Sequence, residues 1–462
     1  MPKEILLNAF NMNCVGHINH GLWTHPRDRS DQYHRLDYWT SLAATLERGL
    51  FDGLFLADIV GVYDVYQQSV DLTLKESIQL PVNDPLMLVS AMAAVTKGLG
   101  FGVTVNVHAE EPYIFARRMS TLDHLTEGRI GWNIVTGYLD SAARAVGQAA
   151  LGEHDTRYDR ADECLDLLYA LWEGSWDDKA VLRDRNARVY ADPRLVRKIR
   201  HEGKYYRAEG YHLSEPSRQR TPVLYQAGTS GRGRQFAARH AECVFISSPD
   251  TTLARTASRA IRQGAVAQGR RAEDVQIFAG VTVVVDRTEN AAREKYEDYV
   301  RYASPEAGLA HFSAGTGIDF SQYDLDEKIT YGKGNFVQSS VDLARERGWT
   351  KRSILSDLAI GGRYPLIVGD PAQVADALEE WVDKGEIDGF NLARTVTPES
   401  YEDFIDLVVP VLQERGRYKT AYAKGSLRNR LFGEGDRLPD RHPGARFRPG
   451  AAAASSSLEY ER

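Results

Sequence analysis

The chain has 462 residues, of which 43% are hydrophobic and 26% are charged. This composition is typical of a soluble globular protein with a substantial core, and it excludes a disordered or fibrous chain. The net charge of −7 gives no overall attraction for nucleic acid or for an anionic membrane surface.

Strands and helices alternate along the first third of the chain. Apolar runs predict four strands, at residues 5–10, 54–58, 100–106 and 129–136. Apolar residues at helical spacing predict the helices that follow these strands, at residues 36–50, 85–97, 114–125 and 158–172. Because each crossover between parallel strands needs a helix, this strict alternation predicts parallel pairing.

Polar side chains gather directly after the first two predicted strands. The first apolar run stops at Asn8, and the run NAFNMNCVGH (8–17) then crowds three asparagines, Cys14 and His17 into ten residues, while Asp58 ends the second strand. In a parallel α/β sheet the strand interiors are apolar, and the groups that bind and react gather at the carboxyl ends. This run therefore predicts the mouth of a barrel, with a pocket over the two strand ends.

The alternation resumes in the second half of the chain. Four more strands are predicted at residues 223–228, 243–248, 275–285 and 389–394. Helices are predicted at residues 230–240 and 252–268, and two more begin at cap-and-proline signals, Asp370-Pro-Ala-Gln373 and Thr397-Pro-Glu-Ser400. Eight strand–helix units predict an α/β fold of the (β/α)8 TIM-barrel class.

Three long segments interrupt the predicted barrel, at residues 59–84, 174–221 and 286–368. The first follows the carboxyl end of a strand, where so long a loop is more often functional than structural. We expect one barrel domain over residues 1–424 that carries these insertions. Residues 425–462 are rich in Gly, Pro, Arg, Ala and Ser, which predicts a partly flexible carboxy-terminal extension able to reach a neighbouring subunit.

The run GTSGRG at residues 228–233 follows a predicted strand and opens a predicted helix. Glycines let the backbone approach a ligand closely, and the free N–H groups of a helix start attract an anion such as phosphate. The alternative is a glycine turn in which Ser230 only caps the helix. Because no GxGxxG follows the first strand and no GxxxxGK[ST] occurs in the sequence, the chain shows no NAD(P)H or ATP site of the usual kind.

Several single residues are candidates for chemistry. Asp58 could bind a polar cofactor edge or act as an acid or base, or it could cap a loop. Asn133 lies in a strand that should be buried, so its amide needs a partner from protein or ligand. A structural role is favoured for Thr104. Cys14 and His17 lie too close in sequence for the usual cysteine–histidine pair, so we do not expect covalent cysteine catalysis.

The remaining cysteines and histidines give no metal or disulfide signal. His17, His20 and His154 have none of the spacings that mark metal sites, so no metal is predicted. The chain has three cysteines, an odd number without a disulfide framework, which predicts a reducing compartment, the cytoplasm. The amino terminus lacks the apolar run of a signal peptide, and no segment has the roughly 20 apolar residues of a membrane span. We therefore expect a protein that is neither exported nor inserted.

Eight motifs that reach to about residue 445 resemble the bacterial-luciferase-like flavin monooxygenases. They are NAFNMNCVGHINHGLW (8–23), LFLADIVGVYDVY (54–66), QLPVNDPLMLVSAMA (79–93), ARRMSTLDHLTEGRIGWNIVT (116–136), HDTRYDRADE (154–163), RTPVLYQAGTSGRG (220–233), AARHAECVF (237–245) and IDGFNL (387–392). The likeness is to the branch that holds nitrilotriacetate, pristinamycin and dibenzothiophene sulfone monooxygenases, and most of all to long-chain alkane monooxygenases.

The resemblance implies the oxygenase component of a two-component monooxygenase. Its cofactor would be FMN, bound at the barrel mouth as FMNH2 that a separate NAD(P)H:flavin reductase delivers, with O2 as co-substrate. Oxygen would add to the flavin as a C4a-hydroperoxide, and one oxygen atom would enter an apolar substrate. The missing nucleotide motifs agree, because such an oxygenase need not bind NAD(P)H itself. A cytoplasmic homodimer or homotetramer that acts in biodegradation is expected.

The resemblance also implies roles for individual residues. The flavin ring and ribityl chain would be held by Asp58, Thr104 and Asn133. The phosphate would be surrounded by His154, Tyr158, Gly228 and Ser230. The substrate and peroxide side would be formed by Cys14, His17, Tyr63, Gln79 and His311.

One position departs from the family pattern. Where long-chain alkane monooxygenases read TSH after the fourth strand, this chain reads Thr136-Gly137-Tyr138. A phenol thus stands beside the flavin in place of an imidazole, and it is bulkier and does not protonate near neutral pH. Alkane specificity therefore does not follow from the resemblance.

The expected roof of the pocket, residues 59–84, holds Lys75 as its only cationic residue. A polyanionic substrate would need several cations to offset its desolvation, so an apolar substrate is favoured. The aromatic and apolar side chains expected to line the pocket are Phe10, Met12, Phe55, Tyr63 and Tyr66. They suit a long-chain alkane, an aromatic sulfone or a halogenated arene equally well. The alternative from another class is a barrel that binds a phosphorylated ligand without redox chemistry, such as an isomerase, a lyase or an F420-type protein.

Overall fold

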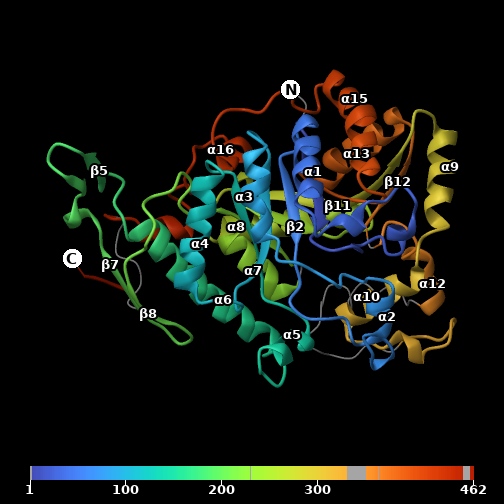
Figure 1. The fold of residues 1–462 in the computed structure, drawn as a ribbon, viewed down its shortest axis with the longest axis horizontal. Coiled ribbons are helices and arrows are strands. Elements are labelled where there is room, and N and C mark those ends of the chain that lie inside the picture. The colour runs from blue at the N-terminus through green and yellow to red at the C-terminus, as the bar shows by residue number, and fades with distance from the viewer. Residues whose placement is uncertain (1–2, 229, 330–349, 363, 451–457, 462) are drawn as a thin grey trace.

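Eight parallel strands close into a barrel in the computed structural model, which describes residues 3–228, 230–329, 350–362, 364–450 and 458–461 (Figure 1). In their order around the barrel, the strands are β1 (Leu6–Met12), β2 (Gly53–Ala57), β3 (Gly100–Asn106), β4 (Ile130–Val135), β9 (Val223–Ala227), β10 (Cys243–Ile246), β11 (Gln276–Val285) and β13 (Gly389–Ala393). β1 pairs with β13 and β10 pairs with β11, so the sheet closes on itself. The predicted (β/α)8 barrel is confirmed. A short further strand, β12 (Leu366–Gly369), pairs with the carboxyl half of β11 inside the third predicted insertion.

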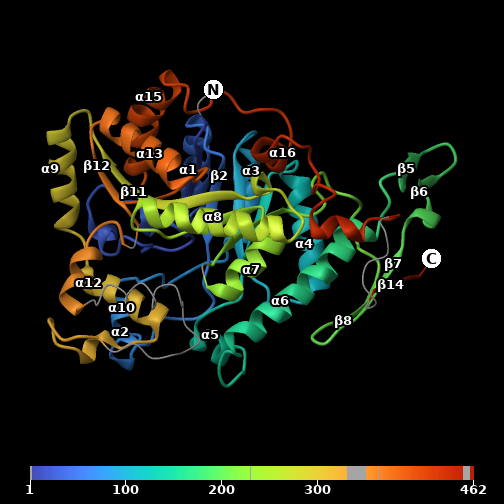
Figure 2. The same ribbon diagram turned by 180° about the vertical axis from the view of Figure 1, so that it is seen from behind.

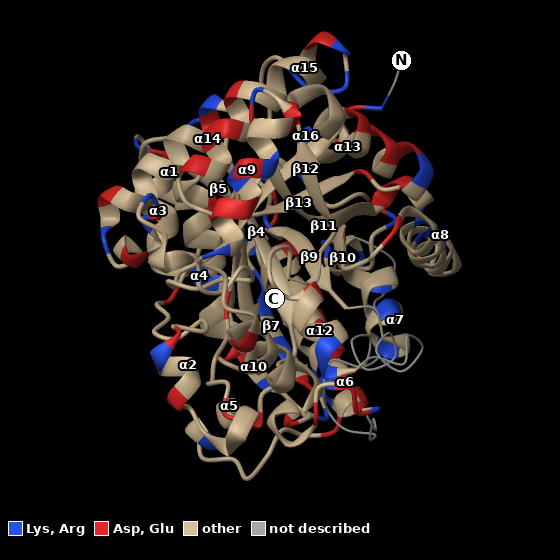
Figure 3. Cartoon of the chain, turned by 90° about the vertical axis from the view of Figure 1, so that its right-hand side faces the viewer, with Lys and Arg blue, Asp and Glu red and all other residues tan. Residues whose placement is uncertain are grey.

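Helices surround the barrel, and Figure 2 shows α7 and α8 crossing its rear face. The outer helices are α1 (Leu36–Arg48), α3 (Leu86–Ala94), α4 (Pro112–Leu125), α6 (His154–Tyr169), α7 (Gly231–His240), α8 (Thr251–Ala267), α13 (Pro371–Gly385), α14 (Glu399–Asp403) and α15 (Val409–Glu414). Charged residues lie mainly on these helices and the loops, while the barrel strands carry few (Figure 3). Among the residues that the structure describes, no helix is long and apolar enough to cross a membrane.

The two predicted caps of the last helices have different outcomes. Asp370 accepts hydrogen bonds from the backbone N–H of Ala372 and Gln373, each at 3.0 Å, and the Gln373 side chain accepts from the Asp370 N–H. The predicted cap at Thr397 is wrong, because α14 begins at Glu399 and no side chain caps it.

Side chains of each barrel strand alternate between the helices and the barrel interior. Phe101, Val103 and Val105 of β3 pack into the main core with the helices. The interior holds a separate cluster that includes Phe10, Phe55, Tyr225 and Phe278. Phe10 and Phe55, which were expected to line a substrate pocket, are therefore packing residues inside the barrel. Their ring centroids lie 5.6 Å apart in an edge-on arrangement.

The first strand is longer than its apolar run predicts. β1 continues to Met12, and Asn8 lies near its start, paired with Gly53 and Asn391 of the neighbouring strands. The Asn8 amide Nδ2 donates to Asn391 Oδ1 at 3.0 Å. A satisfied amide can lie in a buried strand, so Asn8 belongs to the barrel interior and the mouth begins further along the chain.

The first and third insertions form a cap over the carboxyl ends of the strands. The helices of this cap are α2 (Asp71–Lys75), α10 (Pro305–Thr316) and α12 (Lys351–Asp357), and the short α5 (Asp140–Ala145) lies at the same end (Figure 1). The other helix of the third insertion, α9 (Glu289–Val300), packs on the side of the barrel against β11 and β12. The cap has an apolar core of its own, which includes Tyr63, Tyr66, Leu309, Phe312 and Phe320. Residues 330–349 and 363 of the third insertion lie outside the described residues.

The second insertion stands away from the barrel as two hairpins (Figure 1). Its strands are β5 (Val181–Asp184), β6 (Val189–Ala191), β7 (Lys198–Glu202) and β8 (Arg207–Gly210), and β14 (Leu458–Glu461) pairs antiparallel with β7. The charged sequence thus forms two hairpins where an irregular excursion was expected, and Ile199 of β7 packs into the main core.

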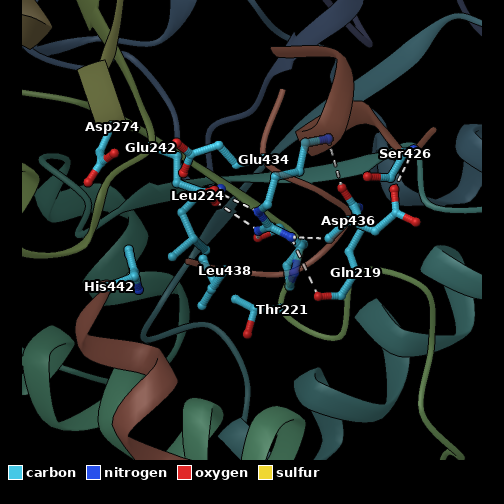
Figure 4. A network of polar contacts seen from close by, with 12 residues as sticks. Gln219, Thr221, Leu224, Glu242, Asp274, Ser426, Glu434, Asp436, Leu438 and His442 are labelled. Carbon is cyan, nitrogen blue, oxygen red and sulfur yellow. Dashed lines mark hydrogen bonds and ion pairs between the residues drawn. The ribbon is translucent and has the colours of Figure 1, made fainter. Parts of the chain in front are cut away.

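Residues from the predicted carboxy-terminal extension pack on the amino-terminal ends of the strands. Arg428 of α16 (Leu427–Phe432) is fully buried, and its guanidinium donates to both carboxylate oxygens of Glu242, at 2.6 and 2.8 Å. It also donates to the backbone carbonyls of Gln219, Pro222 and Asp436. Figure 4 shows Gln219, Glu242 and Asp436 gathered around this network. Residues 451–457 and 462 lie outside the described part of the chain.

Candidate active site

Two polar side chains face each other inside the barrel, in the half that lies toward the carboxyl ends of the strands. Thr104 of β3 and Asn133 of β4 are register partners, and Asn133 Nδ2 donates to Thr104 Oγ1 at 2.8 Å. Asn133 Oδ1 is buried and has no hydrogen-bond partner among the described residues. A buried acceptor left unpaired costs about 1–3 kcal/mol, so this oxygen is suited to an N–H or O–H donor from a ligand.

Asp58 follows β2 and borders a recess at the mouth. The recess is lined by Asp58, Thr104, Asn106, Tyr138 and their neighbours. Burial, followed by the nearby negative charge of Asp84, raises the pKa of the Asp58 carboxyl from 3.8 to about 7. Asp58 is therefore partly protonated at neutral pH and can either donate or accept a hydrogen bond there.

A second group of residues surrounds the start of α7. Ser230 caps this helix by accepting a hydrogen bond from the Gly233 N–H at 3.0 Å, and its Oγ lies 3.3 Å from His154 Nε2. The two interpretations of the GTSGRG run, an anion site and a turn in which Ser230 caps the helix, are thus compatible, because a capped helix start still attracts an anion. His154 lies beside this helix start, whereas His20 lies in the loop after β1, where it contacts His311 of the cap. Thr229 is outside the described residues.

Close approach explains the glycine at the start of this run. A Cβ atom at Gly228 would lie 2.4 Å from Gln226 Nε2 and 3.1 Å from the Tyr158 hydroxyl. Gln226 is buried, and its Oε1 has no partner among the described residues. Burial raises the pKa of Tyr158, so its phenol stays protonated. The glycine leaves an open cradle with an amide, a phenol and a helix start around it.

A chain of polar contacts joins the cap to the mouth. The Tyr63 hydroxyl donates to Gln79 Oε1 at 2.6 Å and lies 3.1 Å from the Tyr138 hydroxyl. The Tyr63 ring stacks on the His311 imidazole with centroids 4.8 Å apart. His311 Nδ1 lies 3.0 Å from His20 Nε2. The structure thus brings together Tyr63, Gln79, Tyr138 and His311, which are separated by up to 248 residues of sequence. Tyr66, in contrast, points its hydroxyl to Glu306 within the cap.

The loop after β1 carries the last two candidates. Burial raises the pKa of the Cys14 thiol to about 12, and the thiol donates to the Gly16 carbonyl. It is therefore protonated at neutral pH, which agrees with the expectation against covalent cysteine catalysis. Burial, followed by the positive charge of Arg394, lowers the pKa of His17 well below 6.5, so His17 is neutral.

Sequence reasoning missed three residues of this mouth. Arg394, directly after β13, is buried and donates to the backbone carbonyls of Cys14 and Val15. Gln226 borders the Gly228 cradle, and His20 contacts His311. A signal existed for Arg394 and Gln226, since each is a polar residue at the end of an apolar strand. No local pattern separates His20 from an ordinary loop histidine.

Comparison with known proteins gives a consistent family. A family model described as luciferase-like monooxygenase matches residues 18–386. The chain is 50% identical over 450 residues to the long-chain alkane monooxygenase of Geobacillus thermodenitrificans, a match that covers 97% of this chain and 99% of that protein. It is 48% identical over 453 residues to the dimethyl-sulfide monooxygenase of Hyphomicrobium sulfonivorans, covering 97% and 94%.

Solved structures give the same result. The crystal structure of a long-chain alkane monooxygenase superposes with a TM-score of 0.91 at 49% identity, covering 97% of this chain and all of that one. A riboflavin lyase that holds a modified FMN and riboflavin superposes with a TM-score of 0.92 at 39% identity, again covering 97% and 100%.

Proposed function

The chain belongs to the luciferase-like monooxygenase family and is a monooxygenase, and we propose that it is the oxygenase component of a two-component system that uses reduced FMN from a separate NAD(P)H:flavin reductase. This proposal rests on one observation. Asn133 Oδ1, inside the barrel near the carboxyl ends of the strands, is buried and has no hydrogen-bond partner among the described residues. A reduced flavin offers ring N–H groups that such an acceptor can bind.

The residues at the mouth fit an FMN molecule in two separate respects. Thr104, Asn133 and Asp58 supply donors and acceptors for a polar ring edge. The start of α7, with its Gly228 cradle and the Ser230 and Tyr158 hydroxyls, suits a phosphate. Because each respect concerns a different part of FMN, we expect riboflavin, which lacks the phosphate, to bind more weakly.

The chain's own residues would bind the flavin and exclude water. Bound reduced FMN would supply the two electrons that activate O2, with one oxygen atom entering the substrate and the other leaving as water. The cap, with its own apolar core, would cover the ring and limit the access of water. The neutral His17 and the Tyr63–Gln79–Tyr138 contacts would line the reacting side.

We propose an apolar substrate. The cap that would cover it is built on Tyr63, Leu139, Phe312 and similar side chains, and Lys75 in residues 59–84 is exposed. The printed names of the two relatives include a long-chain alkane and dimethyl sulfide, which are both apolar. Tyr138 lies beside Tyr63, and these aromatic rings could also contact an aromatic substrate. An aromatic sulfone or a halogenated arene is therefore the rival class.

Anaerobic titration with reduced FMN, followed by exposure to 18O2, tests the proposal. We expect one reduced FMN to bind per chain, and 18O to appear in at least one member of a panel of alkanes, dialkyl sulfides, aryl sulfones and chloroarenes. A folded protein that fails to bind reduced FMN would exclude the oxygenase. Binding of phosphorylated ligands without any oxygen incorporation would favour the non-redox alternative.

A further inference from the structure

A cavity lies between the amino-terminal ends of the barrel strands and the carboxy-terminal part of the chain. Its volume is about 120 Å³, roughly ten times what a single water molecule needs. One side of its wall comes from the loops before β10 and β11, and the other side from residues 428–442. The ionisable residues of the wall are Arg270, Arg271, Arg428, Arg437, Arg441, Glu242, Glu273, Asp274, Glu434 and His442. Figure 4 shows part of this wall, with Glu242, Asp274, Glu434 and His442 labelled.

Four of the five arginines in the wall have carboxylate partners. The ion pairs are Arg428–Glu242, Arg271–Asp274, Arg271–Glu434, Arg441–Asp274, Arg441–Glu434, Arg437–Glu173 and Arg437–Asp178. Glu273 is exposed and makes no ion pair within the described part of the chain. Burial lowers the pKa of His442 well below 6.5, so this imidazole is neutral. The buried carboxylates of the wall are therefore all engaged by arginines other than Arg270.

Arg270, in the loop between α8 and β11, is the exception. It is only 4% exposed, and it makes no ion pair with any residue that the structure describes. Its Nη1 donates to the Ala238 carbonyl at 3.0 Å and its Nη2 to the Asp274 carbonyl at 2.8 Å. Its Nε is buried and has no hydrogen-bond partner among the described residues. A guanidinium has five N–H donors, so Arg270 keeps donors for a further acceptor.

The charge of Arg270 is also poorly compensated. Burial lowers the pKa of Arg270, and the more distant carboxylates of Glu242 and Asp274 offset this effect only in part. The pKa of Arg428, which is fully buried but paired, is raised instead. A buried cation without a counter-charge is destabilising. Water in the cavity could accept its hydrogen bonds but could not balance its charge, whereas an anion would do both.

We propose that this cavity binds a tetrahedral oxyanion, inorganic phosphate or sulfate, which accepts hydrogen bonds from Arg270 and fastens residues 428–442 to the barrel. The planar fork of a guanidinium matches the oxygens of such an anion. The site lies at the opposite end of the barrel from the Gly228 cradle, so it does not depend on the proposed binding of FMN.

Equilibrium dialysis of the wild-type protein against radiolabelled phosphate or sulfate, at fixed ionic strength, measures the binding. We expect each oxyanion to bind, and we expect Arg270→Met to hold one oxyanion per chain at least about tenfold more weakly. The control is Arg448→Met. It removes another guanidinium that pairs with Glu173 but does not line the cavity, so it should bind the oxyanion like the wild type.

A second control is Ser230→Ala, because the start of α7 is another candidate site for an anion. Binding lost in Ser230→Ala and retained in Arg270→Met would belong to that helix and would overturn the proposal. Because a ligand that binds only the folded protein stabilises it, phosphate should raise the urea midpoint of Ser230→Ala but not that of Arg270→Met.

A crystal of the wild-type protein soaked in selenate, an anomalously scattering analogue of sulfate, locates the site even if Arg270→Met does not fold. We expect an anomalous peak within hydrogen-bond distance of the Arg270 guanidinium. Three results would overturn the proposal: no oxyanion bound by the wild type in dialysis, no selenate in this cavity, or unchanged binding in a folded Arg270→Met.

Discussion

At the amino-terminal ends of the barrel strands, the buried guanidinium of Arg428 is matched by a carboxylate and three backbone carbonyls, whereas at the carboxyl ends the buried Asn133 Oδ1 has no partner among the described residues. Buried polarity that is satisfied within the protein contributes to specifying the fold, and buried polarity that is left unsatisfied costs stability and is explained by a ligand. Asn133 Oδ1 is thus available to a ligand donor, whereas the Arg428 guanidinium is satisfied within the protein.

The pKa values of buried carboxyl groups also differ between the two ends. At the amino-terminal ends of the strands, which we call the base, burial would raise the pKa of Glu173, but the guanidinium groups of Arg437 and Arg448 hold it below the usual value. At the mouth, burial and Asp84 raise the pKa of Asp58 to about 7, with no ion-pair partner among the described residues. Changes at the base should therefore affect stability, and changes at the mouth should affect binding.

The largest effect is expected for Arg428→Met at the base. Glu242 would keep its buried charge without its cation, which should lower the free energy of unfolding by about 3–5 kcal/mol. Urea denaturation measures this change. The double variant Arg428→Met/Glu242→Gln removes both charges and should recover part of the loss. A loss below about 1 kcal/mol in the single variant would mean that the ion pair is not stabilising in this way.

Asp58→Asn should have the opposite effect on the unliganded protein. Because the pKa of Asp58 rises from 3.8 to about 7 on folding, the folded protein keeps a proton that the unfolded chain releases. The associated stability is fully present below about pH 4 and is lost as the pH rises through 7. We expect the variant to be about 4 kcal/mol more stable than the wild type at pH 8 and nearly equal at pH 4. Equal gains at both values would refute the raised pKa.

Ser230→Ala should cost about 1 kcal/mol of stability, because the start of α7 loses its cap. If the phosphate of FMN lies there, the affinity for reduced FMN should also fall about tenfold while that for reduced riboflavin stays the same. Ser304→Ala removes a comparable cap from α10 and serves as the control. An equal fall for both flavins in Ser230→Ala would place the phosphate elsewhere.

The smallest effect on stability, within about 0.5 kcal/mol, is expected for Tyr138→His. The preference among alkanes, dialkyl sulfides and aryl sulfones should nevertheless change, because this side chain borders the recess and contacts Tyr63. Tyr138→Phe keeps the ring and removes the hydroxyl, which separates the effect of size from that of hydrogen bonding. An unchanged preference in both variants would show that Tyr138 does not select the substrate.

The barrel could be predicted from the sequence because its signals are local. Each strand is an apolar run, and each helix has its own spacing and caps, so the order of the elements follows from neighbouring residues alone. Asn8 was assigned to the mouth for the same reason, although it lies inside the strand predicted at residues 5–10. Its partner, Asn391, lies 383 residues away, and without that partner a polar residue indicates a ligand-binding position.

The same limit explains the missed residues. The arginine-rich segment after residue 425 has the composition of a flexible arm, and Arg428 becomes a core residue through its contacts with Glu242 and with the Gln219 and Pro222 carbonyls, which are remote in sequence. His20 acquires its place from His311, 291 residues further on. Residues that depend on such remote contacts have no signature in their local sequence.

We propose that the mouth binds reduced FMN, whereas the amino-terminal ends of the strands only stabilise the fold. The most direct test is the dissociation constant of reduced FMN for Asn133→Ala beside Arg428→Met, each measured where the protein is fully folded. We predict about a tenfold weaker affinity for Asn133→Ala, which corresponds to one lost hydrogen bond, and an unchanged affinity for Arg428→Met. Unchanged affinity in Asn133→Ala, or an equal loss in both variants, would contradict the account.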